Sequence, residues 1–361
     1  MTWRRVCLVG IAGLTMTVAI AVGQPDETRS LPWGPGLSAW YPGDAGIENH
    51  PSVVFADNFE IGEIDDLESR WGHVNNRQGR VMSFSDDVPD GSVGLRSLQM
   101  TATRGENSGG ELYKTFDPGW DRIHLRFYAK FAEDHGNLSH FVALRGFDDP
   151  LPYPVGSAGQ LAEDYFSVTI EPTTVETNAY PFTRHAPPGI WRFYAYWPEM
   201  RSWQTVEGEP DGRPNPYYGN LLLPREAAVA PRGEWIAVEF MLKLNSSPWA
   251  RNGELAMWIN GEPLVYFAPG TPHGYWVREA FRNDPYHPDA RPFSGFRWRT
   301  DMNVMINVLR LQHYVSGDAF NSTQNYADNN PDYLINTEEA TVWFDHVVMA
   351  TEYIGPMAGT Y

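Results

Sequence analysis

Apolar and polar residues alternate in many short segments of the chain, and clusters of Gly, Pro, Asn and Asp separate these segments. A period of two is typical of β-strands, because successive side chains point to opposite faces of a sheet. No long segment has the 3.6-residue apolar period of an amphipathic helix. We predict strands over residues 52–59, 97–103, 110–116, 122–131, 141–144, 165–171, 191–197, 235–244, 253–259, 302–314 and 340–350. Many strands joined by turns predict an all-β sandwich of two antiparallel sheets with long loops.

The alternation is clearest in the predicted strand at residues 122–131, where it divides the side chains between two faces. Its apolar residues alternate with Arg126, Tyr128 and Lys130. One face should therefore enter the core, and the other should carry polar groups. We expect the polar face to be available to a ligand.

The segment 191–197 is rich in aromatic residues. Alternation places Tyr194 and Tyr196 on one face, and Phe193 and Trp197 on the other. Aromatic side chains favour strands, and they also stack on the apolar faces of sugar rings. The tyrosine face is therefore a candidate sugar platform, although packing at a sheet edge would explain the same residues.

The first 23 residues predict an export signal. Arg4 and Arg5 precede an uncharged run over residues 6–23, which is too short to span a membrane comfortably. We therefore expect a secreted or periplasmic protein of bacterial origin, with a mature chain of residues 24–361 that forms a single domain with its core at about 50–356. The only cysteine, Cys7, lies in the signal, so the mature chain offers no disulfide and no thiolate.

Charge and composition narrow the choice of partner. The formal net charge of −18 argues against nucleic acid and against anionic membrane surfaces. Trp, Tyr and Phe make up 14% of the chain, which suits a surface that stacks on sugars. A polysaccharide or another glycan is the partner that this composition favours, and the oligomeric state stays open.

Three segments resemble known secreted jelly-roll modules. Residues 55–62 are similar to their opening strand, residues 235–261 to their central hairpin, and residues 342–356 to their closing strand. The chain thus resembles the concanavalin-A-like (laminin-G-like) superfamily, and within it the polysaccharide lyases that include alginate and glucuronan lyases. The resemblance implies a concanavalin-A-like β-jelly-roll and a carbohydrate-active function.

A lyase of this kind removes the C5 proton of a uronate by β-elimination. That step needs a cation or an amide to neutralise the carboxylate, and a Tyr or His to move the proton. The residues of suitable type that we select as catalytic candidates are Arg126, Tyr128, Lys130, His140, Gln312 and His313. The candidates for substrate binding are Tyr194, Tyr196, Lys243, Arg297, Arg299 and Tyr314.

Three other functions fit the same fold. A non-catalytic, lectin-like protein and a structural envelope protein remain alternatives to the lyase. Glycoside hydrolysis ranks last: Glu63, Asp65 and Glu68 match the carboxylate spacing of retaining β-glucanases, but they follow the first strand and are expected to form an acidic loop.

Calcium is the metal that the sequence suggests, because hard carboxylate oxygens are its usual ligands. Asp57 and Glu60 belong to the first strand region and Asp345 to the last, and the terminal strands of such sandwiches commonly pair. We therefore expect that a structural Ca²⁺ would be held by these three acids. No pattern suggests zinc or an organic cofactor.

Overall fold

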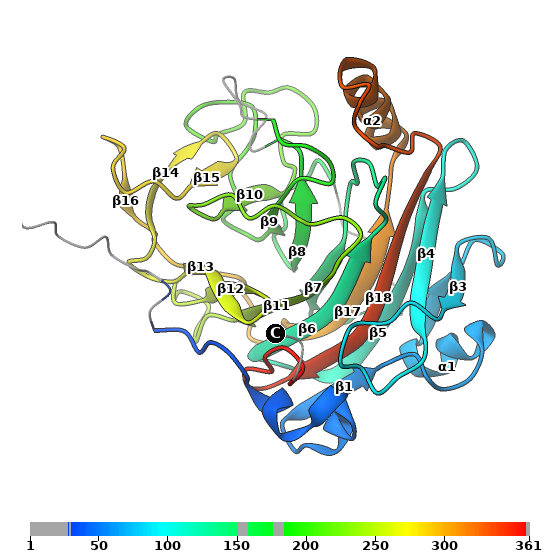
Figure 1. Ribbon diagram of the computed structural model, residues 1–361. Coiled ribbons are helices and arrows are strands. Elements are labelled where there is room, and N and C mark those ends of the chain that lie inside the picture. Colours follow the sequence, from blue (N-terminus) through cyan, green and yellow to red (C-terminus); the bar gives the residue numbers. More distant parts are fainter. Residues whose placement is uncertain (1–27, 29, 151–157, 176–183, 359–361) are drawn as a thin grey trace, which may run out of the picture.

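Two large β-sheets form the centre of the computed structural model, which describes residues 28, 30–150, 158–175 and 184–358 (Figure 1). Sheet A has the order β13-β12-β11-β6-β18-β4-β3, and β1 also pairs with β18. Its strands are antiparallel and comprise β1 (Val53–Asp57), β3 (Met82–Ser85), β4 (Ser97–Thr103), β6 (Arg122–Phe131), β11 (Trp235–Lys243), β12 (Glu254–Ile259), β13 (Glu262–Phe267) and β18 (Glu339–Ala350).

Sheet B has the order β16-β14-β15-β10-β9-β8-β7-β17-β5-β2. Its strands are β2 (His73–Asn75), β5 (Gly109–Trp120), β7 (Val142–Phe147), β8 (Phe166–Thr173), β9 (Ile190–Tyr196), β10 (Asn220–Leu223), β14 (His273–Val277), β15 (Ala280–Arg282), β16 (Arg291–Pro292) and β17 (Met305–Tyr314). Among the strands that the structure describes, only β10 and β15 pair in parallel. In Figure 1 this sheet runs from β14 and β15 at the upper left, through β9 and β8, to β17 and β5 at the lower right.

Helices play a small part in the described ranges. The α-helices are α1 (Leu67–Trp71) and α2 (Gly317–Asn329), and short 3₁₀ helices are η1 (Leu37–Trp40), η2 (Pro42–Asp44), η3 (Ile47–Asn49) and η4 (Ile64–Asp66). None of the described helices is long and apolar enough to cross a membrane. Ser316 is the N-cap residue of helix α2, and its hydroxyl accepts a hydrogen bond from the Ala319 backbone N–H. The predicted signal over residues 1–23 lies outside the described residues.

The core lies between the two sheets, and alternation along the strands creates it. Phe127 of β6 and Phe240 of β11 point from sheet A, and Phe193 of β9 and Leu311 of β17 point from sheet B into the same buried cluster. The Phe193 and Phe240 rings meet edge to face, 6.0 Å apart between centroids. The prediction of an all-β sandwich is therefore confirmed, and so is the division of residues 191–197 into two faces.

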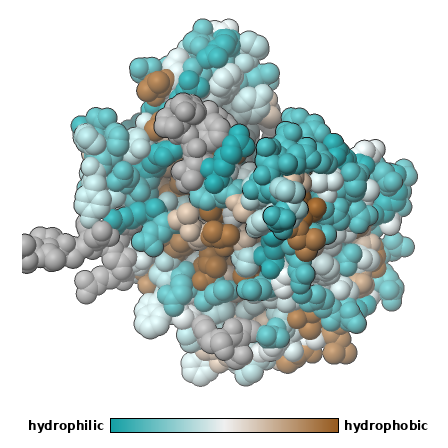
Figure 2. Space-filling view, turned by 45° about the horizontal axis from the view of Figure 1, so that its top comes forward, coloured by the Kyte–Doolittle hydropathy of each residue, from teal (hydrophilic) through white to brown (hydrophobic). Residues whose placement is uncertain are grey.

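The other face of sheet A is covered by chain from both ends of the described structure. Leu37, Ile47 and Ile354 pack there against Val348 and Ala350 of β18. The Trp258 indole of β12 donates a hydrogen bond to the Pro32 carbonyl. Consequently, both faces of sheet A are largely buried. Figure 2 shows one side of the molecule, where hydrophilic residues predominate and apolar residues form small separate areas.

Candidate functional site

Alternate residues of sheet B point away from sheet A, and we call the surface that they form the outer face of sheet B. On β8, Phe166, Val168 and Ile170 enter the core, so Ser167, Thr169 and Glu171 lie on the outer face. Strand register aligns their neighbours: Ser167 lies opposite Arg145 and Tyr196, and Thr169 opposite Tyr194. Polar side chains from three adjacent strands, β7, β8 and β9, therefore share one surface.

A cavity of about 170 Å³ opens on this face. We call it the His140 cavity. Its lining includes side chains of four strands, β7, β8, β9 and β17, together with His140, which lies two residues before β7. Among the lining residues are His140, Arg145, Thr169, Tyr194, Tyr196 and Arg310. The cavity thus brings imidazole, phenol and guanidinium groups together, which is the set of chemical groups that a β-elimination requires.

His140 is held by a buried carboxylate. Its Nδ1 lies 3.1 Å from Oε2 of Glu171, while Oε1 of Glu171 accepts a hydrogen bond from Arg192 at 3.2 Å. The ring lies 5.8 Å from the stacked ring of Tyr314 and 5.2 Å from the ring of Tyr194. Because an ionised carboxylate can only accept a hydrogen bond, Nδ1 is the ring nitrogen that carries the proton, and in the neutral ring Nε2 then carries a lone pair. His140 is therefore arranged as a base.

Tyr194 is arranged as an acid. Its hydroxyl lies 3.1 Å from the hydroxyl of Tyr196. Burial, and then the neighbouring Tyr196 and Glu171, hold the pKa of Tyr194 well above its usual value. The phenol therefore stays protonated at neutral pH and can donate its proton to a departing oxygen.

Two arginines give the cavity a positive charge. Arg145 is 2% exposed, and burial followed by the positive charge of Arg310 lowers its pKa to about 10, so it still carries a charge at pH 7. Nε of Arg310 is buried and has no hydrogen-bond partner among the described residues. Two like charges in a small cavity favour an anionic ligand, and guanidinium groups match the geometry of a carboxylate.

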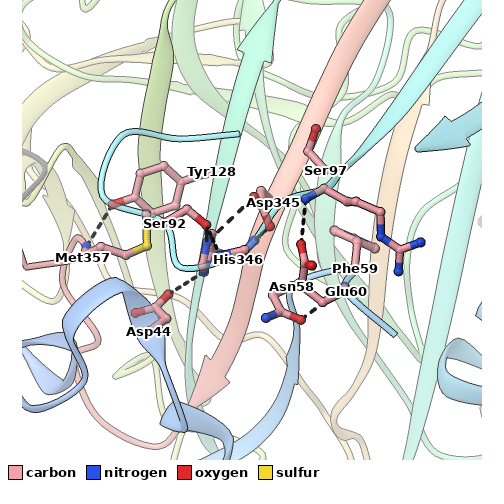
Figure 3. A network of polar contacts seen from close by, with 12 residues as sticks. Asp44, Asn58, Phe59, Glu60, Ser92, Ser97, Tyr128, Asp345, His346 and Met357 are labelled. Carbon is pink, nitrogen blue, oxygen red and sulfur yellow. Dashed lines mark hydrogen bonds and ion pairs between the residues drawn. The ribbon is translucent and has the colours of Figure 1, made fainter. Parts of the chain in front are cut away.

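The structure corrects the expectation that Arg126, Tyr128 and Lys130 face a ligand. They lie on the covered face of sheet A. Arg126 is fully buried and forms an ion pair with Asp44 of η2, because the N-terminal segment lies over this strand. The Tyr128 hydroxyl accepts a hydrogen bond from the Met357 backbone, as Figure 3 shows. Lys130 pairs with Asp87 at 2.7 Å. None of the three lines the His140 cavity.

Five further candidates also lie apart from that cavity. His313 points into the interior, where its Nε2 lies 3.0 Å from Nε2 of His135. Lys243 pairs with Glu254 and Arg297 with Glu199. Arg299 is 2% exposed and donates to the Val304 carbonyl. Gln312 is on the outer face of sheet B, but its amide donates to Glu111 at 2.6 Å.

The three acids proposed for calcium do not form one cluster. Asp57 accepts hydrogen bonds from Arg70 at 3.0 Å and from the Trp71 indole at 2.8 Å. Glu60 accepts from the backbone N–H groups that precede β4, and Asp345 lies near it (Figure 3). Burial, with Glu60 contributing, raises the pKa of Asp345 to about 8. Within the described ranges, no group of three or more Asp, Glu, His or Cys side chains is placed to hold a metal.

Sequence reasoning missed Arg145, Glu171 and Arg310. Each of the three lies in a predicted strand or directly after one, at a position that alternates with core residues. Arg145 follows the predicted strand 141–144 by one residue, and Arg310 alternates with Leu309 and Leu311 in the predicted strand 302–314. The alternation was therefore present, but nothing in the sequence showed that these strands are neighbours.

The acidic segment that matches the β-glucanase spacing is not in a strand. Glu63 caps η4, where its side chain and that of Asp66 form a reciprocal capping box. Glu68 follows in α1. The segment is therefore outside the strands, as predicted, but it forms two short helices and not the predicted loop. Its three matching carboxylates do not line the His140 cavity.

Known structures share this architecture. No profile of a known protein family and no curated protein matches the sequence. Alginate lyase vAL-1 from Chlorella virus superposes with a TM-score of 0.50 and 11% identity, over 83% of this chain and 100% of that one. A mutant of alginate lyase Aly36B in complex with alginate trisaccharide gives 0.48 and 13% identity over 84% and 99%, and an endo-β-1,4-glucuronan lyase from the fungus Trichoderma reesei gives 0.38 and 14% over 83% and 96%. This chain therefore has the concanavalin-A-like jelly-roll fold that is found in polysaccharide lyases.

Proposed function

We propose that the protein is a polysaccharide lyase that cleaves a uronic-acid polymer by β-elimination in the His140 cavity. The observation that carries the proposal is the meeting of an oriented imidazole, a protonated phenol and two arginines around one cavity. Alginate and glucuronan, the substrates in the names of the similar lyases, are the first polymers to test.

The proposed reaction assigns one role to each group. Arg145 and Arg310 pair with the uronate carboxylate, which stabilises the charge that develops on it when C5 loses its proton. Nε2 of His140 takes the C5 proton, and the electrons of the C–H bond form the C4–C5 double bond. The C4–O4 bond breaks, and the leaving O4 receives the hydroxyl proton of Tyr194. Glu171 positions His140 and stabilises the imidazolium that forms.

The direct test is to incubate the mature protein with alginate, glucuronan and other polyuronates and to follow the ultraviolet absorbance of the unsaturated product. We expect product from at least one polymer, and at least a roughly 100-fold fall in kcat for Tyr194→Phe or His140→Ala, the size of a lost acid or base. Tyr266→Phe is the matched control for the tyrosine, because it also removes a hydrogen-bonded phenol hydroxyl, but one that donates to Glu254 in sheet A.

Absence of product across the panel would reject the lyase. If the same polymers then bound to the protein, the result would favour the alternative of a glycan-binding protein. Equal activity of wild type and Tyr194→Phe would leave β-elimination possible but would reject the acid proposed here.

We also propose that a structural Ca²⁺ binds between Glu60 and Asp345. Oδ2 of Asp345 is buried and accepts no hydrogen bond from the described residues, and Glu60 is the nearby carboxylate. Asp57 is excluded because Arg70 and Trp71 both donate to its Oδ2 and the Phe59 backbone N–H donates to its Oδ1. The test is the melting temperature with added CaCl₂ and with EDTA: calcium should raise it in the wild type and not in Asp345→Asn.

Export is a separate proposal. Sequencing of the N-terminus of the protein recovered from a bacterial host tests it, with cleavage expected near residues 21–24 of the predicted signal. An uncleaved chain that stays in the cytoplasm would reject this proposal without affecting the chemistry of the cavity.

A further inference from the structure

The outer face of sheet B continues beyond the His140 cavity toward the opposite edge of the sheet. On β10, Leu222 enters the core, so Leu221 and Leu223 lie on the outer face. On β15, Phe281 enters the core, so Arg282 lies on the outer face beside its register partners, Leu223 of β10 and Tyr275 of β14. The surface therefore crosses β9, β10, β15 and β14 without a break in the hydrogen-bonded sheet.

Two more cavities lie along this surface. The first, of about 490 Å³, shares Tyr194 with the His140 cavity and is also lined by Arg192 and Leu221. The second, of about 340 Å³, is lined by Leu223, Arg225, Tyr275, Arg282 and Asp284, and we call it the distal cavity. The His140 cavity is lined from β17, β7, β8 and β9, the first of these two from β8, β9 and β10, and the distal cavity from β9, β10, β15 and β14. The three cavities therefore follow one another across the sheet.

The distal cavity has the chemistry of an anionic sugar site. Arg225 and Arg282 are half-buried and supply two guanidinium groups. The Tyr275 ring stacks on His287 with 3.6 Å between centroids, which holds the ring in place. Asp284 is the acidic residue of the lining, and its Oδ1 already accepts a hydrogen bond from the Tyr286 backbone. Arginine pairs with carboxylates and a fixed aromatic ring contacts the apolar face of a sugar.

The distance between the two ends of the surface sets the length of the ligand. Strands β8 and β14 are separated by β9, β10 and β15, which makes four strand spacings. At about 4.8 Å per spacing, the β14 wall of the distal cavity lies roughly 19 Å from the β8 wall of the His140 cavity. A short oligosaccharide bound at His140 would not extend that far, whereas a longer chain would.

We infer that the distal cavity is a second binding site for the same polyuronate chain, in which Arg225 and Arg282 contact a uronate several residues away from the one in the His140 cavity. The inference takes its substrate class from the proposed function. Under this inference, β14 and β15 help to bind the polymer, and the affinity for an oligosaccharide depends on the number of its sugar residues.

Equilibrium binding measured by titration calorimetry tests this inference. The protein carries Tyr194→Phe, which slows turnover at least about 100-fold under the proposed function. The probes are the trisaccharide and the octasaccharide of alginate and of glucuronan. We expect the double variant Arg225→Gln, Arg282→Gln to bind the octasaccharide roughly tenfold more weakly or worse, which is the loss expected for charge-assisted hydrogen bonds, and the trisaccharide unchanged. Arg251→Gln is the matched control, because this exposed arginine pairs with Glu199 outside the three cavities.

Undiminished octasaccharide binding, or an equal loss for both lengths, would overturn the inference, provided that the melting temperature shows the double variant to be folded. Failure to bind any polyuronate would overturn it as well. The proposed function is judged separately by product formation in the protein that retains Tyr194. A length-dependent loss without any product would reject the lyase and keep the distal site.

Discussion

Replacement of Glu171 by glutamine is the most informative change in the His140 cavity. Glu171 is 1% exposed, and its two oxygens accept from His140 and from Arg192. An amide offers one oxygen and one NH₂ group. Arg192 has only donors, so the amide oxygen must face Arg192 and the NH₂ group must face His140. Nδ1 of His140 then accepts a hydrogen bond, and the ring proton moves to Nε2.

This change removes the lone pair that the proposed mechanism uses, with little change of shape. Loss of a positioned base costs about 10²–10⁴ in rate, or ~2.7–5.4 kcal/mol of barrier. We therefore expect kcat of Glu171→Gln on the best polyuronate to fall at least 100-fold, and nitrogen NMR of His140 to report the opposite tautomer. Glu111→Gln is the control, because Glu111 also lies on the outer face of sheet B but bonds Gln312. Wild-type kcat in a folded Glu171→Gln variant would refute the role of His140 as the base.

Four further outcomes follow from the structure. Asp44→Asn leaves Arg126 buried without its anion and should lower the free energy of unfolding by about 3–5 kcal/mol, as measured by denaturant titration. Burial lowers the pKa of His135 from 6.5 to about 4 and the pKa of His313 well below 6.5. As the pH falls below 6.5, the unfolded chain therefore binds protons before the folded one does, and the free energy of unfolding should fall by ~1.4 kcal/mol per histidine for each pH unit. His313→Gln should reduce this dependence. Arg310→Gln should lower kcat/KM about 10- to 100-fold through the lost carboxylate contact, whereas Arg251→Gln should not. Moderate salt should raise kcat/KM on a polyuronate, as measured at fixed pH.

The sequence predicted the strands and their faces, but it did not predict which face is covered. Arg126 and Tyr194 each lie in a segment of alternating residues, on the face that the sequence assigns away from the core. Arg126 became an internal ion-pair partner because Asp44, more than eighty residues earlier, lies over sheet A. Tyr194 lines a cavity because the described residues leave a space of about 170 Å³ over sheet B at that point. Alternation is a local property, whereas the cover depends on contacts between distant segments.

The histidines show the same limit. His140 and His313 were selected for their chemistry alone. Strand β17 directs His313 into the interior, where His135 is its neighbour, while the bridge between His140 and Tyr314 places His140 on the outer face. Three residues of the site, Arg145, Glu171 and Arg310, come from three different strands. Their meeting is a consequence of the strand order β8-β7-β17, which no local pattern encodes.

The charge distribution reconciles an acidic protein with an anionic polymer. The whole chain has a formal net charge of −18, so its long-range field repels a polyuronate. Arg145 and Arg310 act over the few ångströms of the His140 cavity, where low polarity strengthens their attraction. Salt screens exposed charges beyond about 10 Å at 0.1 M but screens contacts within a cavity far less. Added salt therefore weakens the repulsion more than the binding, which is the opposite of its effect on a protein that attracts polyanions through a basic surface.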